Sequence, residues 1–311
     1  MTKMKKAVRR DKWVDRIIFL GGDDAFRRHW SEKFGGEMPQ MSEHEELSKT
    51  YMEIAIWDIC VGALNRVLAK LEQPAIFADF DRLHVLETAV FDKDLGANCA
   101  GKFQYGHVYV RRVENAYDLV GFLCHELVHL ASRFELTLAP AGDRARIESV
   151  REGHLVAASD DDSPPLFLGL NEAVTEQLAS MVRREVLRSL NGTSDENRIR
   201  LSATWCYEPQ IMVVTEACNR LAAVLGLEPR QTGRFLFRGY FNGSNAFVRK
   251  LRLNLPETYA ALRDMGDDAA DARRAAEILG YDAVLERLGP PAPEQAPAPA
   301  PEPPKDGGSA A

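Results

Sequence analysis

The most constraining feature of the sequence is an apolar segment, residues 115–134, that contains three ionisable side chains in a five-residue motif. Its apolar positions recur as in a helix that is buried on most of its surface. His125 and His129 stand four residues apart, so both imidazoles lie on one face of that helix and can reach a single metal ion. Burying two histidines and a glutamate, Glu126, is costly unless a partner satisfies them. The segment therefore predicts a packed helix that carries a metal site.

The spacing His125-Glu126-x-x-His129 also predicts how each residue would act. The two histidines are the expected zinc ligands. Glu126 is displaced around the helix, and is expected to hold the attacking water and take its proton as general base. The competing interpretation is a pair of core histidines that hydrogen-bond to backbone or carboxylate groups. The apolar setting favours the metal site, because such a buried pair needs a strong partner.

A catalytic zinc site takes three protein ligands and leaves one position open for water. The best candidate for the third ligand is Glu172, in the segment GLNEAVTE at 169–176, on a predicted helix over 169–190. Glu176 follows one turn later on the same face. Taken alone, Glu172 is better explained as a solvated carboxylate in the first turn of a helix, with Asn171 as the N-cap. Its pairing with the histidine motif favours the ligand.

The HExxH motif at 125–129 and the NExxTE motif at 171–176 together resemble the gluzincin branch of the zincin metallopeptidases, which includes the thermolysin-like enzymes. In that branch the first Glu of the second motif is the third zinc ligand, and the later acid supports a zinc-bound histidine. The resemblance assigns these roles to Glu172 and Glu176. It covers the two motif helices and, loosely, the strands before them. The GxMEN segment of the aminopeptidases is absent, and the 43 residues from His129 to Glu172 exceed the gap in thermolysin.

Two other positions compete for the third ligand. In metzincins, HExxH continues with Gly at the place of Ser132 and with His or Asp at the place of Glu135. Ser132 lacks the conformational freedom of glycine, which disfavours this option. His154, in the polar stretch Glu152-Gly153-His154, is a candidate ligand or transition-state donor, and an ordinary loop histidine is the simpler interpretation.

Amide hydrolysis also needs a donor for the developing oxyanion. Tyr207, at the start of a predicted helix over 208–225, is the first candidate, and His154 is the second. A half-buried aromatic residue at a helix start is an equally good explanation of Tyr207. Residues 105–112 (YGHVYVRR) predict an edge strand beside the motif helix, which can pair with an extended peptide. A plain structural strand is the alternative.

The whole pattern predicts an α+β fold that is mostly helical. The resemblance implies that it is zincin-like, with a small mixed sheet packed on the HExxH helix and a helical C-terminal half. The other expected helices are 43–72, 229–240, 256–264 and 267–287. The expected strands are 82–90 and 103–112. Residues 141–165 are polar and predict a loop, with a short helix near 146–151.

Composition suggests four regions. These are an N-terminal extension over 1–40, a subdomain with the sheet and the HExxH helix over 41–135, a helical subdomain supplying the third zinc ligand over 136–289, and a Pro/Ala-rich tail over 290–311. The tail cannot build a core, so it is expected to be disordered and is suited to binding a partner. The subdomain boundary falls just after the HExxH helix, which would put the two motifs on different subdomains.

The net charge and the cysteine content limit the binding partners and the cellular compartment that we expect for this protein. A net charge of -7 opposes nucleic-acid binding, which requires a basic face. Five cysteines without a CxxC pair oppose a disulfide framework and favour a reducing compartment. The basic N-terminus is followed by only four apolar residues, 17–20, too few for export or a membrane span. We therefore expect a cytoplasmic protein with no membrane span.

The leading hypothesis is a zinc metallopeptidase, with Zn²⁺ as cofactor and a peptide or protein as substrate. The alternative is a catalytically inactive zincin-fold binding protein in which zinc is structural. A closed structural site needs no general base, so Glu126 and the supporting Glu176 favour the enzyme. A third hypothesis is a helix that matches the motif by coincidence, and it predicts that no metal is bound.

Overall fold

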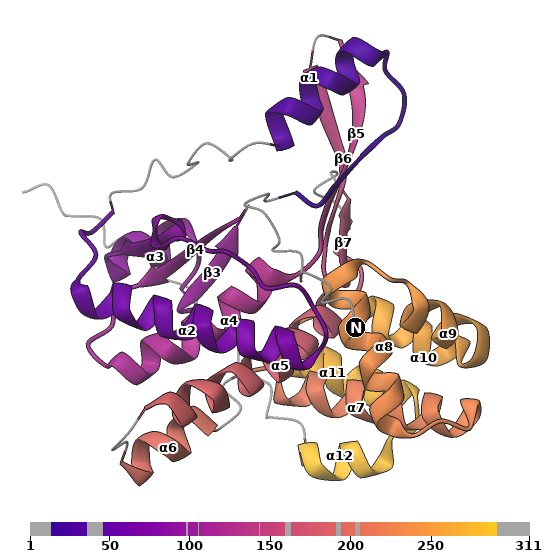
Figure 1. Cartoon of the computed structure of the whole chain (residues 1–311). Coiled ribbons are helices and arrows are strands. Elements are labelled where there is room, and N and C mark those ends of the chain that lie inside the picture. Colours follow the sequence, from indigo (N-terminus) through magenta and orange to yellow (C-terminus); the bar gives the residue numbers. More distant parts are fainter. Residues whose placement is uncertain are drawn as a thin grey trace, which may run out of the picture.

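Helices make up most of the described chain and accompany two small mixed sheets, so the expected α+β, mostly helical fold class is confirmed (Figure 1). This computed structural model describes residues 14–35, 46–97, 99–104, 106–142, 144–158, 163–190, 194–202 and 206–290. Most of the Pro/Ala-rich tail, 291–311, lies outside the described residues. So do the ends of the N-terminal extension, 1–13 and 36–40.

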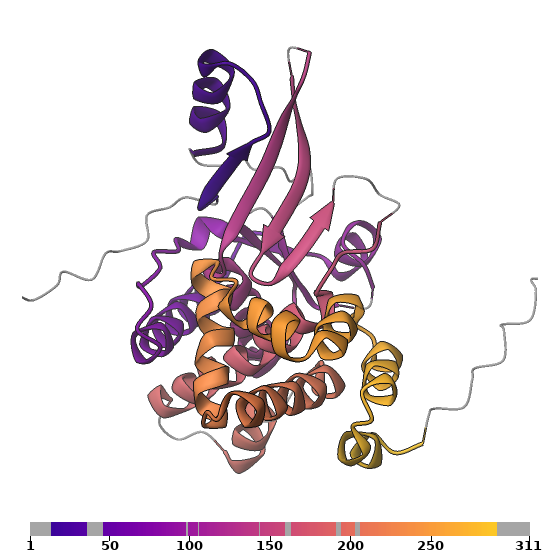
Figure 2. The ribbon, with the colours of Figure 1, turned by 90° about the vertical axis from the view of Figure 1, so that its right-hand side faces the viewer.

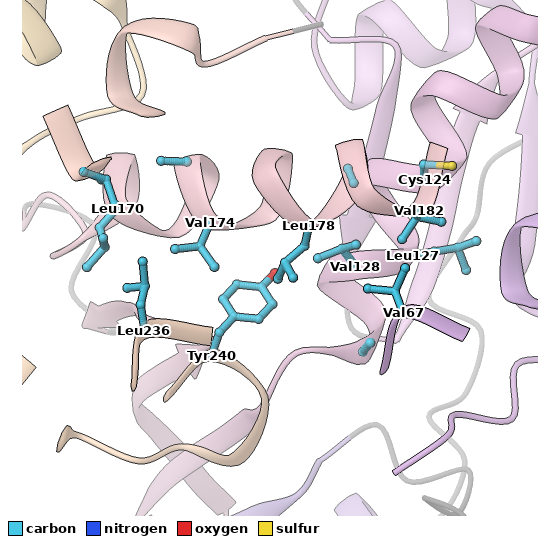
Figure 3. Packing of buried hydrophobic residues seen from close by; sticks show 14 of the residues in the cluster. Val67, Cys124, Leu127, Val128, Leu170, Val174, Leu178, Val182, Leu236 and Tyr240 are labelled. Atoms are coloured by element: carbon cyan, nitrogen blue, oxygen red, sulfur yellow. The ribbon is translucent and has the colours of Figure 1, made fainter. Parts of the chain in front are cut away.

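Three long helices form the centre of the molecule: α2 (Tyr51–Lys70), α4 (Ala116–Ala131) and α5 (Leu168–Ser189). The first two begin where the side chains of Thr50 and Asn115 accept hydrogen bonds from backbone N–H groups of the first turn. Figure 3 shows side chains of the main core along these helices, among them Val67, Cys124, Leu127, Val174, Leu178 and Val182. Removing this apolar surface from water, at roughly 25 cal/mol per Å², packs α4 against α5 and brings the two sequence motifs together.

A three-stranded sheet lies against α4. Its order is β2-β4-β3, with β2 (Leu83–Leu86) parallel and β3 (Gly101–Gln104) antiparallel to β4 (His107–Arg111). The expected edge strand at 105–112 is wrong, because β4 is the central strand and β3 lies at the edge. The predicted strand is divided at Gly106, whose φ of 85° suits a glycine in a tight turn.

The segment predicted as a loop over 141–165 is mostly a β-hairpin. The strands of this second sheet, in the order β1-β5-β6-β7, are β1 (Arg16–Phe19), β5 (Phe134–Ala141), β6 (Arg144–Glu152) and β7 (Leu155–Ala158). The helix expected near 146–151 is therefore wrong, since these residues belong to β6. The loop prediction failed because β6 alternates polar residues with a few apolar ones, as in a strand with one solvated face.

We refer to β1, the β5–β6 hairpin and helix α1 (Asp24–Gly35) as the arm, which projects from the helical body (Figures 1 and 2). β1 pairs with β5 in parallel, and α1 covers the sheet. The arm has its own small hydrophobic cluster, separate from the main core, formed by Val14, Trp30, Phe134, Leu136 and Leu138. Part of the N-terminal extension thus belongs to the same sheet as residues that follow the HExxH helix.

The helical C-terminal half packs on α5 (Figure 1). Its helices are α6 (Asp195–Ser202), α7 (Glu208–Leu225), α8 (Pro229–Asn242), α9 (Ala246–Asn254), α10 (Pro256–Asp264), α11 (Ala269–Ile278) and α12 (Asp282–Leu288). The expected helix over 267–287 is two helices, because Gly280 adopts a φ of 59° between them. The expected strand over 82–90 ends at Leu86, and helix α3 (Thr88–Asp94) follows it.

Within the described part of the chain, no single helix has both the length and the apolar composition required to cross a membrane. Only α7 and α8 taken together pass that test, and they meet at a bend of 117°. The five cysteines are free thiols. Two of them, Cys60 on α2 and Cys124 on α4, are buried with their sulfur atoms 3.9 Å apart, where they pack as small apolar side chains.

Candidate metal centre

The three expected ligands meet where α4 faces the first turns of α5. The Nε2 atoms of His125 and His129 lie 3.2 Å apart. Glu172 Oε2 lies 3.3 Å from the former and 3.5 Å from the latter. Ligand atoms at about 2.0–2.2 Å from a tetrahedral zinc ion are separated from each other by roughly 3.3–3.6 Å. The three donor atoms therefore fit one tetrahedral cation with a fourth position left for water.

The competing interpretation of Glu172, a solvated carboxylate in a first turn capped by Asn171, is wrong. The N-cap of α5 is Phe167, with a φ of 61°, Asn171 lies within the helix, and Glu172 is buried. The side-chain oxygen of Asn171 instead accepts a hydrogen bond of 3.0 Å from the backbone N–H of His154. This bond holds the β6–β7 turn against α5, one residue before Glu172. The turn and the third ligand are thus positioned by the same stretch of α5.

Each histidine is oriented by a carboxylate at its other ring nitrogen. Glu176 Oε2 lies 3.1 Å from His125 Nδ1, and Glu152 Oε1 lies 2.6 Å from His129 Nδ1. The fully buried Arg183 pairs with the second oxygen of Glu176. A carboxylate on Nδ1 fixes the ring and leaves the Nε2 lone pair available for a cation.

Two of these supporting residues are missing from the sequence predictions. Arg183 lies two helical turns after Glu176 on the same face, so helical spacing was an available signal for it. Glu152 carried no such signal. It ends a strand that was taken for a loop, and its distance along the chain from the HExxH motif follows no helical or strand period.

Glu126 is buried, with 7% of its surface exposed, and lies against the edge strand β3. A Cβ atom at Gly101 would come within 2.9 Å of Glu126 Cγ, so glycine is required for this close approach. Burial raises the pKa of Glu126, positive charge on His125 and His129 lowers it, and neighbouring carboxylates raise it again, for a net upward shift. A raised pKa suits a carboxylate that must accept a proton.

The centre favours positive charge. Burial lowers the pKa of His125, but hydrogen bonds with Cys206 and Glu172 raise it, and the net shift is well upward. Burial raises the pKa of Glu172, but positive charge on His129 and a hydrogen bond with His125 lower it, and the net shift is downward. Glu172 therefore remains ionised in a buried position, as a cation ligand must.

The structure separates the two candidate oxyanion donors. The Tyr207 ring stacks on the His125 ring, with centroids 5.7 Å apart. Burial raises the pKa of Tyr207, so its hydroxyl keeps its proton. His154 instead lies in the β6–β7 turn, where Nε2 donates a hydrogen bond of 3.0 Å to the carbonyl oxygen of Leu236. Only Tyr207 of this pair lies at the metal centre.

The alternative ligands lie elsewhere. Ser132 is the C-cap of α4, and Glu135 on β5 forms an ion pair with Arg133 at 3.0 Å. Among the described residues, the groups of donor atoms close enough to share a cation include neither of these residues, and they do not include His154.

A second group of donor atoms overlaps the first. His125, Glu176 and Cys206 each bring a ligand atom within 4.8 Å of the others, and Cys206 Sγ lies 3.6 Å from Glu176 Oε2. This group would use the carboxylate that orients His125, and Cys206 is exposed. The first group is buried and leaves the hydrogen bonds from both histidines intact, so it is the better cation site.

Replacing Glu152 by glutamine is expected to weaken zinc binding about tenfold, because the amide can accept the hydrogen bond of His129 but lacks the negative charge. Competition with a chromophoric chelator measures this affinity. The matched control is Glu148→Gln on the same strand, where the carboxylate pairs with Arg146 at the surface. Equal zinc affinities for both variants would show that Glu152 does not support the site.

No protein-family model, curated protein or solved structure matches this chain. The interpretation of the centre therefore depends on its own geometry: the donor triangle, the two supporting carboxylates and the buried glutamate beside them.

Proposed function

We propose that this chain is a zinc-dependent metallopeptidase of the gluzincin type, acting on a peptide or protein substrate, with a zincin-like fold. The observation that carries the proposal is the buried triangle of His125, His129 and Glu172 donor atoms, with the Glu126 carboxylate next to it. Three protein ligands characterise catalytic zinc sites, whereas structural sites are closed by four. The structural-zinc alternative also leaves the buried Glu126 without a role.

In the proposed reaction, each residue of the centre has a separate role. Bound zinc would lower the pKa of a water molecule and polarise the substrate carbonyl. Glu126 takes the proton of the attacking water and passes it to the leaving amine. Glu176 and Glu152 hold the two imidazoles in place, and the protonated hydroxyl of Tyr207 donates to the oxyanion that develops on the carbonyl.

Strand β3 is the proposed docking edge for the substrate backbone. Among the described strands it pairs only with β4, so its other edge has backbone groups available. Gly101 of this strand lies against Glu126, and the Phe103 ring lies parallel to that of His129, with centroids 6.1 Å apart. An extended peptide paired with β3 would therefore bring its scissile bond near the base.

The test is metal content together with chelator-sensitive hydrolysis. Protein purified without chelators is expected to contain about one zinc per chain, and to cleave a quenched fluorescent peptide library. Treatment with 1,10-phenanthroline should abolish cleavage, and added zinc should restore it. The non-chelating isomer 1,7-phenanthroline is the matched control. Absence of zinc, or cleavage that is unaffected by chelation, would contradict the proposal.

A further inference from the structure

A second candidate site is an open pocket of about 390 Å³ beside the β6–β7 turn. Its walls come from the end of β6, the β6–β7 turn, β7, the start of α5 and helices α9 and α10. Its volume falls within the roughly 300–1,000 Å³ typical of small-molecule sites. None of its described lining residues belongs to the donor triangle of His125, His129 and Glu172.

The pocket is positively charged. Arg151, Arg249 and Arg252 line it, and no acidic residue is found among its described lining residues. Arg151 is held in place by hydrogen bonds to the carbonyl oxygens of Gly153 and Gly243, at 3.2 and 3.3 Å. Glu135 lies 3.8 Å from it and partly balances its charge.

The other two arginines have no acidic partner among the described residues. Arg249 and Arg252 are exposed on α9, and within the described chain neither forms an ion pair. They lie three residues apart, so both guanidinium groups are carried on the same side of the helix. Arg252 lies over the ring of Tyr259, at 5.9 Å from its centroid. Two unneutralised guanidinium groups beside one pocket are suited to binding a carboxylate or phosphate in bidentate fashion.

The rest of the wall is apolar. Val156, Phe167, Val248 and Tyr259 contribute it, with the rings of Phe167 and Tyr259 in edge-to-face contact at 5.7 Å between centroids. Covering this surface with the apolar part of a ligand removes apolar area from water, which favours binding. A bare inorganic anion would leave this surface in water.

We propose that this pocket binds a small amphipathic anion, consisting of an aromatic body that carries a carboxylate or phosphate group. The aromatic body lies against Phe167 and Tyr259, and the anionic group is held by Arg249 and Arg252, with Arg151 deeper in the wall. The pocket is distinct from the metal centre, and the proposal stands whether or not the chain is a peptidase.

The pocket and the metal centre are nevertheless connected through the β6–β7 turn. Arg151 and His154 line the pocket, and Glu152 between them holds His129. An occupied pocket therefore contacts residues on both sides of the carboxylate that orients a zinc ligand.

Isothermal titration calorimetry with phenyl phosphate tests the proposal. Inorganic phosphate and benzyl alcohol serve as probes that each lack one half of the ligand. Zinc-free protein is titrated in parallel, so that phosphate binding to zinc at the catalytic centre is not mistaken for binding in the pocket. The test variant is Arg249→Gln/Arg252→Gln, and the matched control is Arg230→Gln, an exposed arginine on α8.

Wild type and Arg230→Gln are expected to bind one phenyl phosphate per chain, with or without zinc. The double variant should bind at least about tenfold more weakly, because it loses two charge-assisted contacts to the phosphate group. Inorganic phosphate and benzyl alcohol should each bind at least about tenfold more weakly than phenyl phosphate. Equal affinity of the double variant, equal affinity for either partial probe, or no saturable binding of phenyl phosphate up to roughly 10 mM would overturn the proposal.

Discussion

Replacing Glu126 by glutamine is expected to remove most of the peptide-hydrolysing activity while zinc stays bound. Glutamine keeps the size of the side chain and its packing against Gly101, but it cannot take a proton from water at neutral pH. The loss in kcat/KM should be roughly 10³-fold, the middle of the range for a general base, which corresponds to about 4 kcal/mol of transition-state stabilisation. The measurements are initial rates on a fluorogenic peptide and zinc content by mass spectrometry on the same samples.

The control for this variant is Glu257→Gln, an exposed carboxylate on α10 that lies outside the donor triangle. It should match the wild type in both measurements. If Glu126→Gln retained wild-type activity, Glu126 would not be the base. If it lost zinc together with activity, the carboxylate would be needed for the metal rather than for proton transfer.

Replacing Glu172 by alanine is expected to remove zinc from the purified protein, because two imidazoles alone form an incomplete site. The loss of zinc should also lower the thermal stability of the protein. A ligand that binds only the folded state adds about 4 kcal/mol when its concentration is a thousand times the dissociation constant. Adding a chelator should therefore lower the Tm of the wild type, whereas the Tm of Glu172→Ala should be the same with and without chelator.

The matched control is Gln177→Ala, a half-buried position on the same helix. It should keep zinc and the chelator-dependent Tm. Should Glu172→Ala keep one zinc with unchanged affinity, the His125, Glu176 and Cys206 group would be the metal site instead. Zinc loss in Cys206→Ser would then identify it.

The residues of the centre that could be predicted are those whose spacing in the sequence follows the turn of a helix. HExxH on α4 and the two carboxylates of α5 each follow from one turn of helix, and both helices have strongly apolar faces that made them recognisable. The two motifs come together because α4 packs on α5, and neither motif alone predicts this packing. The resemblance to gluzincins supplied that step.

The parts that could not be predicted come from the strands. Glu152 reaches His129 from a hairpin whose solvated face made its sequence look like a loop. The edge beside the centre is β3 rather than β4, because the chain turns at Gly106 within what looked like one strand. The left-handed residue Phe167 starts α5 before the Asn171 that propensity favours as a cap, since tertiary contacts outweigh a weak local preference.

The separate hydrophobic cluster of the arm has a consequence for how the protein loses structure. Cooperative units with few apolar contacts open at lower free energy than the main core. At the hairpin tip, Ala141 pairs with Arg144 beyond the residues that β1 covers, whereas Phe134 pairs with Glu152 at the base, next to the body. Fraying would start at the tip and pass towards the body. Glu152, whose carboxylate orients His129, belongs to the last residue pair at the base of the hairpin. Partial melting of the arm from its tip would therefore leave the metal centre assembled.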